Sequence, residues 1–475
     1  MNIVEALVDL LGTTAVLQTE ADTEAFTEDW RGRYRGRAAC VVLPSSVEQV
    51  SAVVRLCAGH GVAVLPQGGN TSLCGGAVPD EAQRLPVIVS LGRMRKVRSI
   101  DPANNSMVVE AGCVLATVQQ AAAEASRLYP VSLGAEGSCQ IGGTIATNAG
   151  GTGVLRWGGT RDNVLGLEVV LPDGAVWDGL YALRKNNTGL DLKHLFIGAE
   201  GTMGIITAAA LKLHPLPTSH AVAWFAPADP QAAVEVLGLF QARCGARLSA
   251  FEMMDAHQLD LVLQHVPGRR SPLPSARPWH VLVELADTCD AALLDRDLED
   301  VLAHASERGL LDDAVFASSG AQRAAFWEVR HSVSEANKKA GMGLTTDCAV
   351  PVSAVPAFIA QATKAVRRLV PDMPVAVVAH LGDGNAHFIP FYSFAQWEQL
   401  PDREAAAQAI RHAVNDVAHA LGGTFSAEHG IGRTQLAEMR SYKSPVELAL
   451  MRTLKQALDP RHLFNPGRLV PGAEA

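Results

Sequence analysis

Four long glycine-rich segments, separated by short strand-like runs, constrain this fold more than any other feature of the sequence. They are PQGGNTSLCGG (66–76), SLGAEGSCQIGGTIATNAGGTG (132–153), NNTG (186–189) and GAEGTMGIIT (198–207). Glycine lets a backbone approach a ligand closely and point successive N–H groups at an anion, although any one such segment could equally be a plain turn. Three of the four are interleaved with polar residues drawn from Ser, Thr and Asn, two or more of these types in each, rather than with Lys. Together they favour a long, polar, phosphate-bearing cofactor held largely by backbone.

The runs between these segments predict an α+β fold. SSVEQVSAVVRLCAGHG (45–61) indicates a helix capped by Ser46 and ended by Gly59 or Gly61, and PVIVSL, SMVVEAG and LGLEVVLPDG indicate short strands. This order is not the regular βαβ alternation of a Rossmann sheet. GTGVLR (151–156) breaks the G-x-G-x-x-G pattern and no G-x-x-x-x-G-K-[ST] segment is present, so the sequence disfavours NAD binding by a Rossmann unit and a P-loop NTPase.

A change in composition near residue 216 predicts a domain boundary. Alanine-rich helical segments (230–245, 291–309, 353–370) then alternate with strand-like runs, and from about residue 425 the chain is mainly helix and loop. A chain of 475 residues is long enough for two or three domains. We therefore expect domains at 1–216 and 217–424, followed by a C-terminal segment at 425–475.

Charge and cysteine usage narrow the class of protein. The net charge of −9 argues against nucleic-acid binding, because phosphate recognition needs a basic surface. The eight cysteines are scattered and never form C-x-x-C, which favours buried thiols in a reducing compartment. No window of 18 apolar residues lacks charge, and the first residues lack a basic n-region. We expect no transmembrane segment and a cytoplasmic protein, with attachment to the periphery of the inner membrane left open.

Two histidines flank a tight turn in AHLGDGNAHF (379–388). Asp-Gly between strand-like runs is a strong hairpin signal, and a two-residue loop at 383–384 would place His380 directly opposite His387. Opposed Cβ atoms lie about 4.5–5.5 Å apart, which suits two imidazoles on one metal ion but also two ordinary polar histidines on a hairpin. SAEHGIG (426–432) adds Glu428 and His429. Two histidines and one carboxylate can form an open site for a divalent ion.

Five segments together resemble one family. PQGGNTSLCGG, GSCQIGGTIATNAGG, RKNNTGLDLKHLFIGAEGTMGIIT, HLGDGNAHF and SAEHGIGR occur in the order found in the FAD-linked D-2-hydroxy acid dehydrogenases of the vanillyl-alcohol-oxidase/p-cresol-methylhydroxylase (VAO/PCMH) superfamily. The resemblance covers about residues 25–470. RKNNTGLDL and SAEHG look most like the D-2-hydroxyglutarate dehydrogenase branch. The family resemblance implies that residues 1–216 form a PCMH-type FAD-binding domain, residues 217–424 a substrate-binding cap, and residues 425–475 a segment that completes the active site.

The resemblance implies which residues bind FAD. Segment 66–76 would wrap the pyrophosphate, while 132–153 and 198–206 would complete the cofactor cleft. The carried-over residues are Pro66, Gly68, Gly69, Asn70, Thr71, Gly76, Gly137, Ser138, Gly142, Gly143, Thr144, Asn148, Gly151, Glu200 and Ile206. Members with a covalently tethered flavin carry a histidine where this chain has Asn70. We therefore expect non-covalent FAD.

The resemblance also implies which residues bind a metal ion and which residue acts as the catalytic base. His380, His387 and Glu428 would hold a divalent metal, usually zinc, His429 would be the neighbouring base and Asn385 would face the substrate. The family pattern R-x-x-x-[ST] selects Arg330 and Ser334 for the substrate carboxylate, and their spacing predicts one helical turn between them on a common face.

One departure bears on the substrate. Some hydroxyglutarate enzymes carry a lysine fifteen residues after the arginine, where this chain has Thr345, and TTD (345–347) looks more like the D-lactate branch. The expected reaction is FAD- and metal-dependent oxidation of a D-2-hydroxy acid, with D-2-hydroxyglutarate favoured and D-lactate dehydrogenase or glycolate oxidase subunit as alternatives. The implied electron acceptor is an electron-transferring flavoprotein or a quinone, and a homodimer stays one option. A metallohydrolase and a non-catalytic binding protein remain rival classes.

Overall fold

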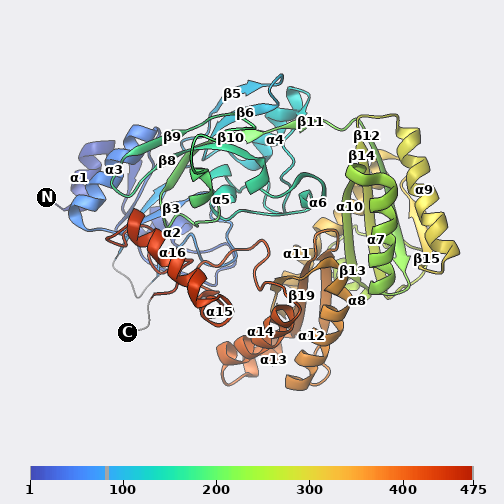
Figure 1. Ribbon diagram of the computed structural model, residues 1–475. Helices are drawn as coiled ribbons and strands as arrows, with labels where there is room; N and C mark the ends of the chain where they lie inside the picture. The colour runs from blue at the N-terminus through green and yellow to red at the C-terminus, as the bar shows by residue number, and fades with distance from the viewer. Residues whose placement is uncertain (1, 81–84, 473–475) are drawn as a thin grey trace. The chain divides into compact units, whose positions relative to one another are not determined.

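The computed structural model describes residues 2–80 and 85–472, and within them the chain forms two compact units (Figure 1). The first unit contains residues 1–150, 158–215 and 428–475, and the second contains 151–157 and 216–427. The division falls between residues 215 and 216 and again between 427 and 428, and the C-terminal residues cluster with the first unit. The part of the chain described here has no helix long and apolar enough to cross a membrane.

A small, mostly parallel sheet carries the first glycine-rich loop. Its strand order is β1-β2-β4-β3, with β2 and β3 parallel to β4 and β1 antiparallel to β2. The strands and accompanying helices are β1 (Val16–Leu17), β2 (Cys40–Val42), β3 (Val64–Gln67), β4 (Val87–Ser90), α1 (Ile3–Leu11), α2 (Glu20–Thr27) and α3 (Val47–His60). The Ser46 side chain caps α3 and Gly61 ends it in the left-handed conformation, which confirms the helix expected there. Because β3 ends at Gln67, it delivers Gly68 directly into the loop.

A second sheet of the first unit is antiparallel, and the glycine-rich segment 198–207 leads into one of its strands, β10. Its order is β5-β6-β10-β8-β9, and buried residues of β6, β8 and β10 enter the unit's main core. The elements are β5 (Val97–Asp101), β6 (Ser106–Glu110), β8 (Val164–Val170), β9 (Val176–Gly179), β10 (Ile205–Lys212), α4 (Leu115–Glu124), α5 (Ile141–Ala146) and the pair β7 (Arg127–Leu128) and β11 (His214–Pro215). Two C-terminal helices, α15 (Leu436–Tyr442) and α16 (Pro445–Leu458), complete the unit.

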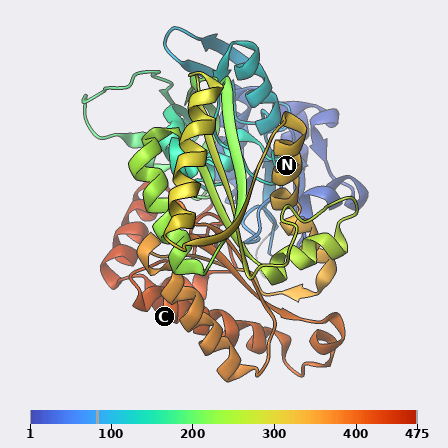
Figure 2. The same ribbon diagram turned by 90° about the vertical axis from the view of Figure 1, so that its right-hand side faces the viewer.

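The second unit is an antiparallel sheet with helices on both faces. The strand order is β15-β12-β14-β13-β18-β19-β16, and β17 also pairs with β19. The strands are β12 (Ser219–Pro227), β13 (Leu248–Asp255), β14 (Trp279–Asp287), β15 (Leu311–Phe316), β16 (Met342–Gly343), β17 (Thr346–Ala349), β18 (Val375–His380) and β19 (Asn385–Tyr392). Figure 2 shows α9 (Ala291–Glu307, yellow) running alongside these strands.

Alternating side chains of this sheet enter two separate cores. One core joins the sheet to α7 (Pro230–Cys244), α9, α12 (Val355–Leu369) and α14 (Arg403–Ala420). The other core, on the opposite face, joins it to α8 (Ala256–His265), α10 (Gly320–His331) and α11 (Val333–Ala340). The remaining elements are α6 (Val154–Trp157), α13 (Phe394–Gln399), η1 (Thr13–Ala15), η2 (Arg161–Asn163), η3 (Leu192–Leu195), η4 (Gly245–Arg247) and η5 (Val352–Ala354). The expected α+β class is confirmed, as are the helices expected at 230–245, 291–309 and 353–370, each to within a few residues.

All eight cysteines are free thiols, and all but Cys289 are buried. Burial raises the pKa of Cys40 and of Cys57 to about 12, which keeps these thiols protonated.

Candidate functional site

Glycine permits the close packing of two glycine-rich loops in the first unit. A Cβ on Gly69 would lie 2.1 Å from the carbonyl oxygen of Ser138, and one on Gly142 would lie 2.7 Å from the Cβ of Ala111. Gly137 and Gly143, in contrast, have nothing within 4 Å of the Cβ position. Some glycines thus serve backbone packing, while others leave a backbone surface that no side chain covers.

The other predicted cofactor residues lie in or next to the glycine-rich segments. Pro66 lies in β3, Thr71 and Gly76 follow Asn70 in the loop, Ser138 is exposed, Thr144 lies in α5, Ile206 lies in β10, and Gly151 begins the short stretch assigned to the second unit.

Three predicted cofactor residues other than glycine adopt the left-handed conformation. They are Asn70 (φ 53°), Asn148 (φ 49°) and Glu200 (φ 50°), which lie in the glycine-rich segments 66–76, 132–153 and 198–207. The Asn70 side-chain amide donates to the carbonyl oxygens of Glu28 (2.7 Å) and Ala25 (3.2 Å). The Asn148 side-chain oxygen accepts from the Arg161 amide (3.0 Å). Such backbone strain persists where the surroundings enforce it and is common at ligand sites.

The register of the histidine hairpin corrects the expectation. His380 pairs with Asn385 and His387 pairs with Val378, so the two histidines are not directly opposite and the connection is a turn at 381–384. The Gly384 amide closes this turn on the carbonyl oxygen of His380 (3.1 Å). A shift of two residues keeps both side chains on the same sheet face, because strand side chains alternate with a period of two. The ring centroids lie 5.5 Å apart, so the two imidazoles are still neighbours.

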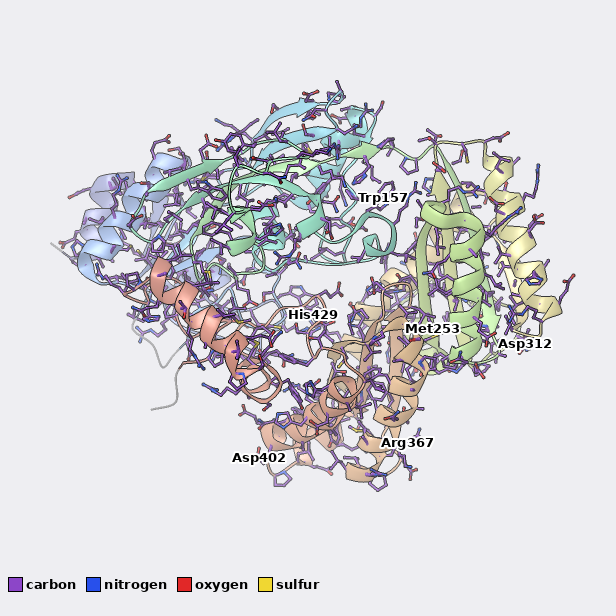
Figure 3. The ribbon with its side chains drawn as sticks, in the orientation of Figure 1. Trp157, Met253, Asp312, Arg367, Asp402 and His429 are labelled. Atoms are coloured by element: carbon purple, nitrogen blue, oxygen red, sulfur yellow. The ribbon has the colours of Figure 1, made fainter. Side chains whose placement is uncertain are left out.

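Glu252 on β13 links the predicted substrate arginine to the first histidine. Its side chain is 2% exposed, and it accepts from Arg330 Nε (2.8 Å) and from His380 Nδ1 (2.9 Å). Arg330 Nη2 lies 2.8 Å from Glu252 Oε2 and 3.4 Å from His380 Nε2. Burial alone would raise the pKa of Glu252, but His380 and Arg330 outweigh it and hold that pKa below its ordinary value. Met253, the next residue on β13, is labelled in Figure 3.

Arg330 and Ser334 do not share a helix face, which corrects a second expectation. α10 ends at His331 and α11 begins at Val333, with Ser332 between them. Arg330 is buried, whereas Ser334 is exposed. The Arg330 guanidinium retains one nitrogen, Nη1, for which the described residues offer no hydrogen-bond partner.

Asp347 on β17 organises the second histidine and the predicted substrate amide. Its Oδ1 lies 3.7 Å from His387 Nδ1 and accepts from Asn385 Nδ2 (3.1 Å), and all three side chains are buried. The Ala427 amide donates to the carbonyl oxygen of Asp347 (2.9 Å) and to its Oδ2 (3.1 Å). Asp347 thus holds the backbone of Ala427, which is the residue immediately before Glu428 and His429 in the sequence.

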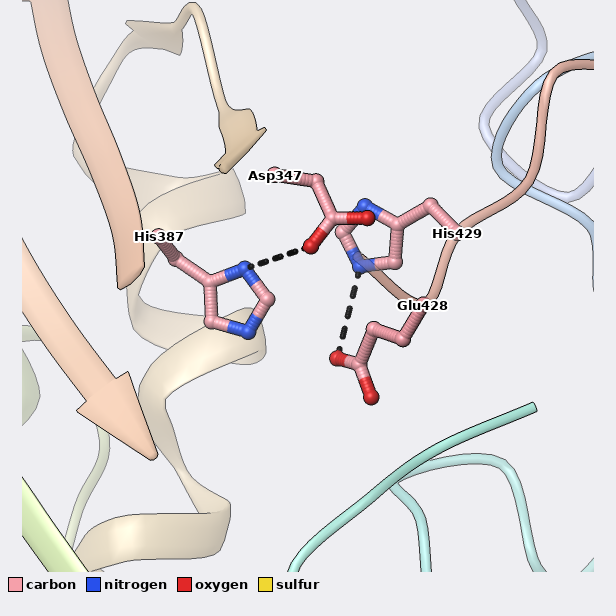
Figure 4. Close-up of side chains that lie close together, drawn as sticks. All are labelled: Asp347, His387, Glu428 and His429. Carbon is pink, nitrogen blue, oxygen red and sulfur yellow. Dashed lines mark ion pairs between the residues drawn. The ribbon is translucent and has the colours of Figure 1, made fainter. Parts of the chain in front are cut away.

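Glu428 and His429 form a second ion pair, drawn with the first in Figure 4. His429 Nε2 lies 3.8 Å from Glu428 Oε1, and His429 lies on the loop before α15 (Figure 3). Asp347 and His387 belong to the second unit and Glu428 and His429 to the first, and each pair combines a carboxylate with an imidazole, the donor types that hold a divalent cation. His380 belongs to neither pair. Its Nδ1 is bound to Glu252, which is the arrangement that orients a metal-ligating histidine through its other nitrogen.

Sequence reasoning missed Glu252 and Asp347. Each had a signal, because each is a carboxylate inside a strand and follows or precedes apolar residues, as in SAFEMMD and TTDCAV. A buried strand charge requires a partner, and here the partners are Arg330 and His380 for Glu252 and Asn385 for Asp347.

Comparison with known proteins adds the family. The protein family described as FAD linked oxidases, C-terminal domain, matches residues 216–469, and the family described as FAD binding domain matches residues 38–179. The mitochondrial D-2-hydroxyglutarate dehydrogenase of Arabidopsis thaliana is 36% identical over 467 residues, which are 98% of this chain and 80% of that protein. The putative mitochondrial D-lactate dehydrogenase C713.03 of Schizosaccharomyces pombe is 34% identical over 467 residues, 95% of this chain and 85% of that protein.

Among solved structures, p-cresol methylhydroxylase with substrate bound superposes with a TM-score of 0.77 at 18% identity, covering 99% of this chain and 96% of that one. At this identity the likeness concerns the fold alone.

Proposed function

Because the chain belongs to the FAD-linked oxidases, we propose that it is an FAD-dependent dehydrogenase that oxidises a D-2-hydroxy acid to the 2-oxo acid. The observation that carries this proposal is the buried cluster of Arg330, His380 and His387 on one sheet face, with Glu252 and Asp347 as carboxylate partners. Such a cluster can bind a carboxylate and a hydroxyl at once.

FAD fits the glycine-rich loops of the first unit. The uncovered backbone at Gly137 and Gly143 and the enforced left-handed residues Asn70 and Asn148 support assigning the cofactor to segments 66–76 and 137–151. Asn70 offers no nucleophile for a flavin linkage, so the cofactor is non-covalent. When bound, FAD supplies the hydride acceptor.

A divalent cation fits the donor set. The proposed ligands are His380, His387 and Glu428, as the resemblance implies, and zinc is the proposed ion. His387, Glu428 and Asp347 supply donors of the kind that hold a metal, and the contact of His380 with Glu252 supports its inclusion. When bound, the cation stabilises the ionised form of a substrate hydroxyl.

The residues of the chain have separate tasks in this mechanism. The free Nη1 of Arg330 donates to the substrate carboxylate, while Glu252 holds the rest of the guanidinium in place. His429 accepts the proton of the 2-hydroxyl as general base. Asn385, fixed by Asp347, presents its amide oxygen to the substrate. Electrons leave for an electron-transferring flavoprotein or a quinone, the acceptors that the resemblance implies.

D-2-hydroxyglutarate is the proposed substrate, and D-lactate is the second candidate. The 36% identical relative over nearly the whole chain supports the first. Thr345 supports the second, because it leaves the distal carboxylate of hydroxyglutarate without the cation found in some hydroxyglutarate enzymes.

A dye-reduction screen over D- and L-2-hydroxy acids tests the proposal. We expect turnover with D-2-hydroxyglutarate or D-lactate and none with the L-enantiomers. Absence of dye reduction with every hydroxy acid by a protein that carries stoichiometric FAD would refute the proposed reaction.

A further inference from the structure

Glu200 binds two backbone amides of a neighbouring loop with its carboxylate. Oε1 accepts from the Ile431 amide (2.7 Å) and Oε2 accepts from the Gly432 amide (2.8 Å). All three residues belong to the first unit, and the side chain is nearly fully buried. Both carboxylate oxygens are therefore used to hold residues 428–433, which we name the base loop because it begins with Glu428 and His429.

The backbone of Glu200 is itself fixed. Its amide donates to the carbonyl oxygen of Ala146, the last residue of α5 (2.8 Å), and its carbonyl oxygen accepts from Asn465 Nδ2 (2.8 Å). Its φ of 50° is a conformation that a residue with a side chain adopts only where its surroundings enforce it. The carboxylate is thus presented from a rigid position at the end of a predicted cofactor helix.

The base loop lies against a second anchor at Cys74, in the first glycine-rich loop. The carbonyl oxygen of Cys74 accepts from the Arg433 amide (3.0 Å) and from Thr434 Oγ1 (3.0 Å). A Cβ on Gly430 would lie 2.8 Å from Glu200 Oε1, and one on Gly432 would lie 2.1 Å from the Cys74 carbonyl oxygen. Close approach to these two anchors thus accounts for both glycines of HGIG.

We propose that Glu200 is a positioning residue for the base: through the Ile431 and Gly432 amides it fixes the base loop, and with it the imidazole of His429. This inference rests on the function proposed above, and it reassigns a side chain that the resemblance placed among the FAD contacts. His429 lies two residues before Ile431, so a shift of the base loop moves the imidazole. A misplacement of about 1 Å can reduce a rate by about 10²-fold.

Glu200→Gln is the direct test, because it keeps the size of the side chain and replaces one accepting oxygen with an NH₂ that faces an amide donor. Hydrogen–deuterium exchange of the peptide containing residues 428–434 reports the anchor without any substrate. Anaerobic stopped-flow reduction of the flavin by D-2-hydroxyglutarate, or D-lactate if the screen selects it, reports the base. The matched control is Glu168→Gln. Glu168 is a buried carboxylate on β8 of the same unit, and it pairs with Arg98 on β5 and accepts from Thr207 on β10.

We expect Glu200→Gln to speed exchange in the base loop and to lower the limiting reduction rate about 10- to 100-fold at unchanged FAD content. The pH dependence of that rate should also shift, since the base has moved. Glu168→Gln should keep the wild-type rate and pH dependence. A merely structural role would lower the melting temperature in both variants and leave the rate of the remaining holoenzyme unchanged.

Gly430→Ala perturbs the same contact from the opposite side, and it serves if Glu200→Gln does not fold. It should reproduce the slow reduction. Wild-type exchange, or a wild-type reduction rate, in a folded variant overturns the inference. If wild-type flavin is not reduced by any 2-hydroxy acid, the proposed function fails and the role toward the base fails with it, whereas the exchange result still decides whether Glu200 holds the loop.

Discussion

Replacing Glu252 by Gln should weaken the metal site and the second unit together. The substitution preserves the shape of the side chain but removes the negative charge that Arg330 and His380 share within 2.9 Å. Removing one partner of a buried ion pair typically costs about 3–5 kcal/mol, since the other charge is left buried. Losing the partner that orients a metal-ligating histidine typically lowers metal affinity about 10- to 100-fold.

Two measurements separate these effects. The free energy of unfolding comes from urea titration of the metal-free protein, and the zinc affinity comes from competition with a chelator of known affinity. Glu284→Gln is the matched control, because Glu284 on the adjacent strand β14 also accepts from a histidine, His220 Nδ1 (2.9 Å), but lies outside the cluster. We expect reduced zinc affinity in Glu252→Gln only. Equal zinc affinities in Glu252→Gln and the wild type would show that His380 is not oriented by Glu252 for a metal.

Three further predictions concern the flavin, the base and pH. Acid denaturation should release all of the yellow colour into the supernatant, because Asn70 forms no flavin bond; colour on the precipitate would contradict this. His429→Asn should retain FAD and most of the metal while its flavin reduction rate falls about 10²–10⁴-fold in stopped flow, the usual contribution of a general base, and loss of metal would instead make His429 a ligand. Burial raises the pKa of Asp255 to about 6 from an ordinary 3.8, so the folded protein binds this proton more tightly than the unfolded chain, and stability from this group is lost as pH rises from about 4 to 6. The variant Asp255→Asn can still accept from the Gln258 and Val377 amides. Its free energy of unfolding, measured by urea titration, should therefore exceed that of the wild type by up to about 3 kcal/mol at pH 8 but not at pH 4.

Local sequence rules predicted the elements well where one local interaction decides. Helix α3 begins after Ser46 and ends at Gly61, because a side-chain cap and a left-handed glycine depend only on residues close by in the sequence. The Asp-Gly hairpin was placed correctly, but its register was wrong by two residues because pairing depends on the neighbouring strands β13 and β17 as well as on the turn. Because the shift is two residues, both side chains still lie on the expected face of the sheet, and His380 and His387 are still neighbours.

The partners of buried charges depended on tertiary structure. Glu252 lies 78 residues before Arg330 and 128 before His380, and no local pattern joins them. The break between α10 and α11 at Ser332 was also missed, because HSVSEA continues the helical pattern without Gly or Pro. Long-range packing thus decided which of the predicted residues share a surface.

Anaerobic mixing of the FAD-loaded protein with each enantiomer of 2-hydroxyglutarate and lactate tests the central claim most directly. The account predicts that the flavin absorbance bleaches with a D-enantiomer, that one equivalent of 2-oxo acid forms per flavin, and that the L-enantiomers leave the spectrum unchanged. A flavin that stays oxidised with both D-acids, or that bleaches equally with both enantiomers, would contradict it.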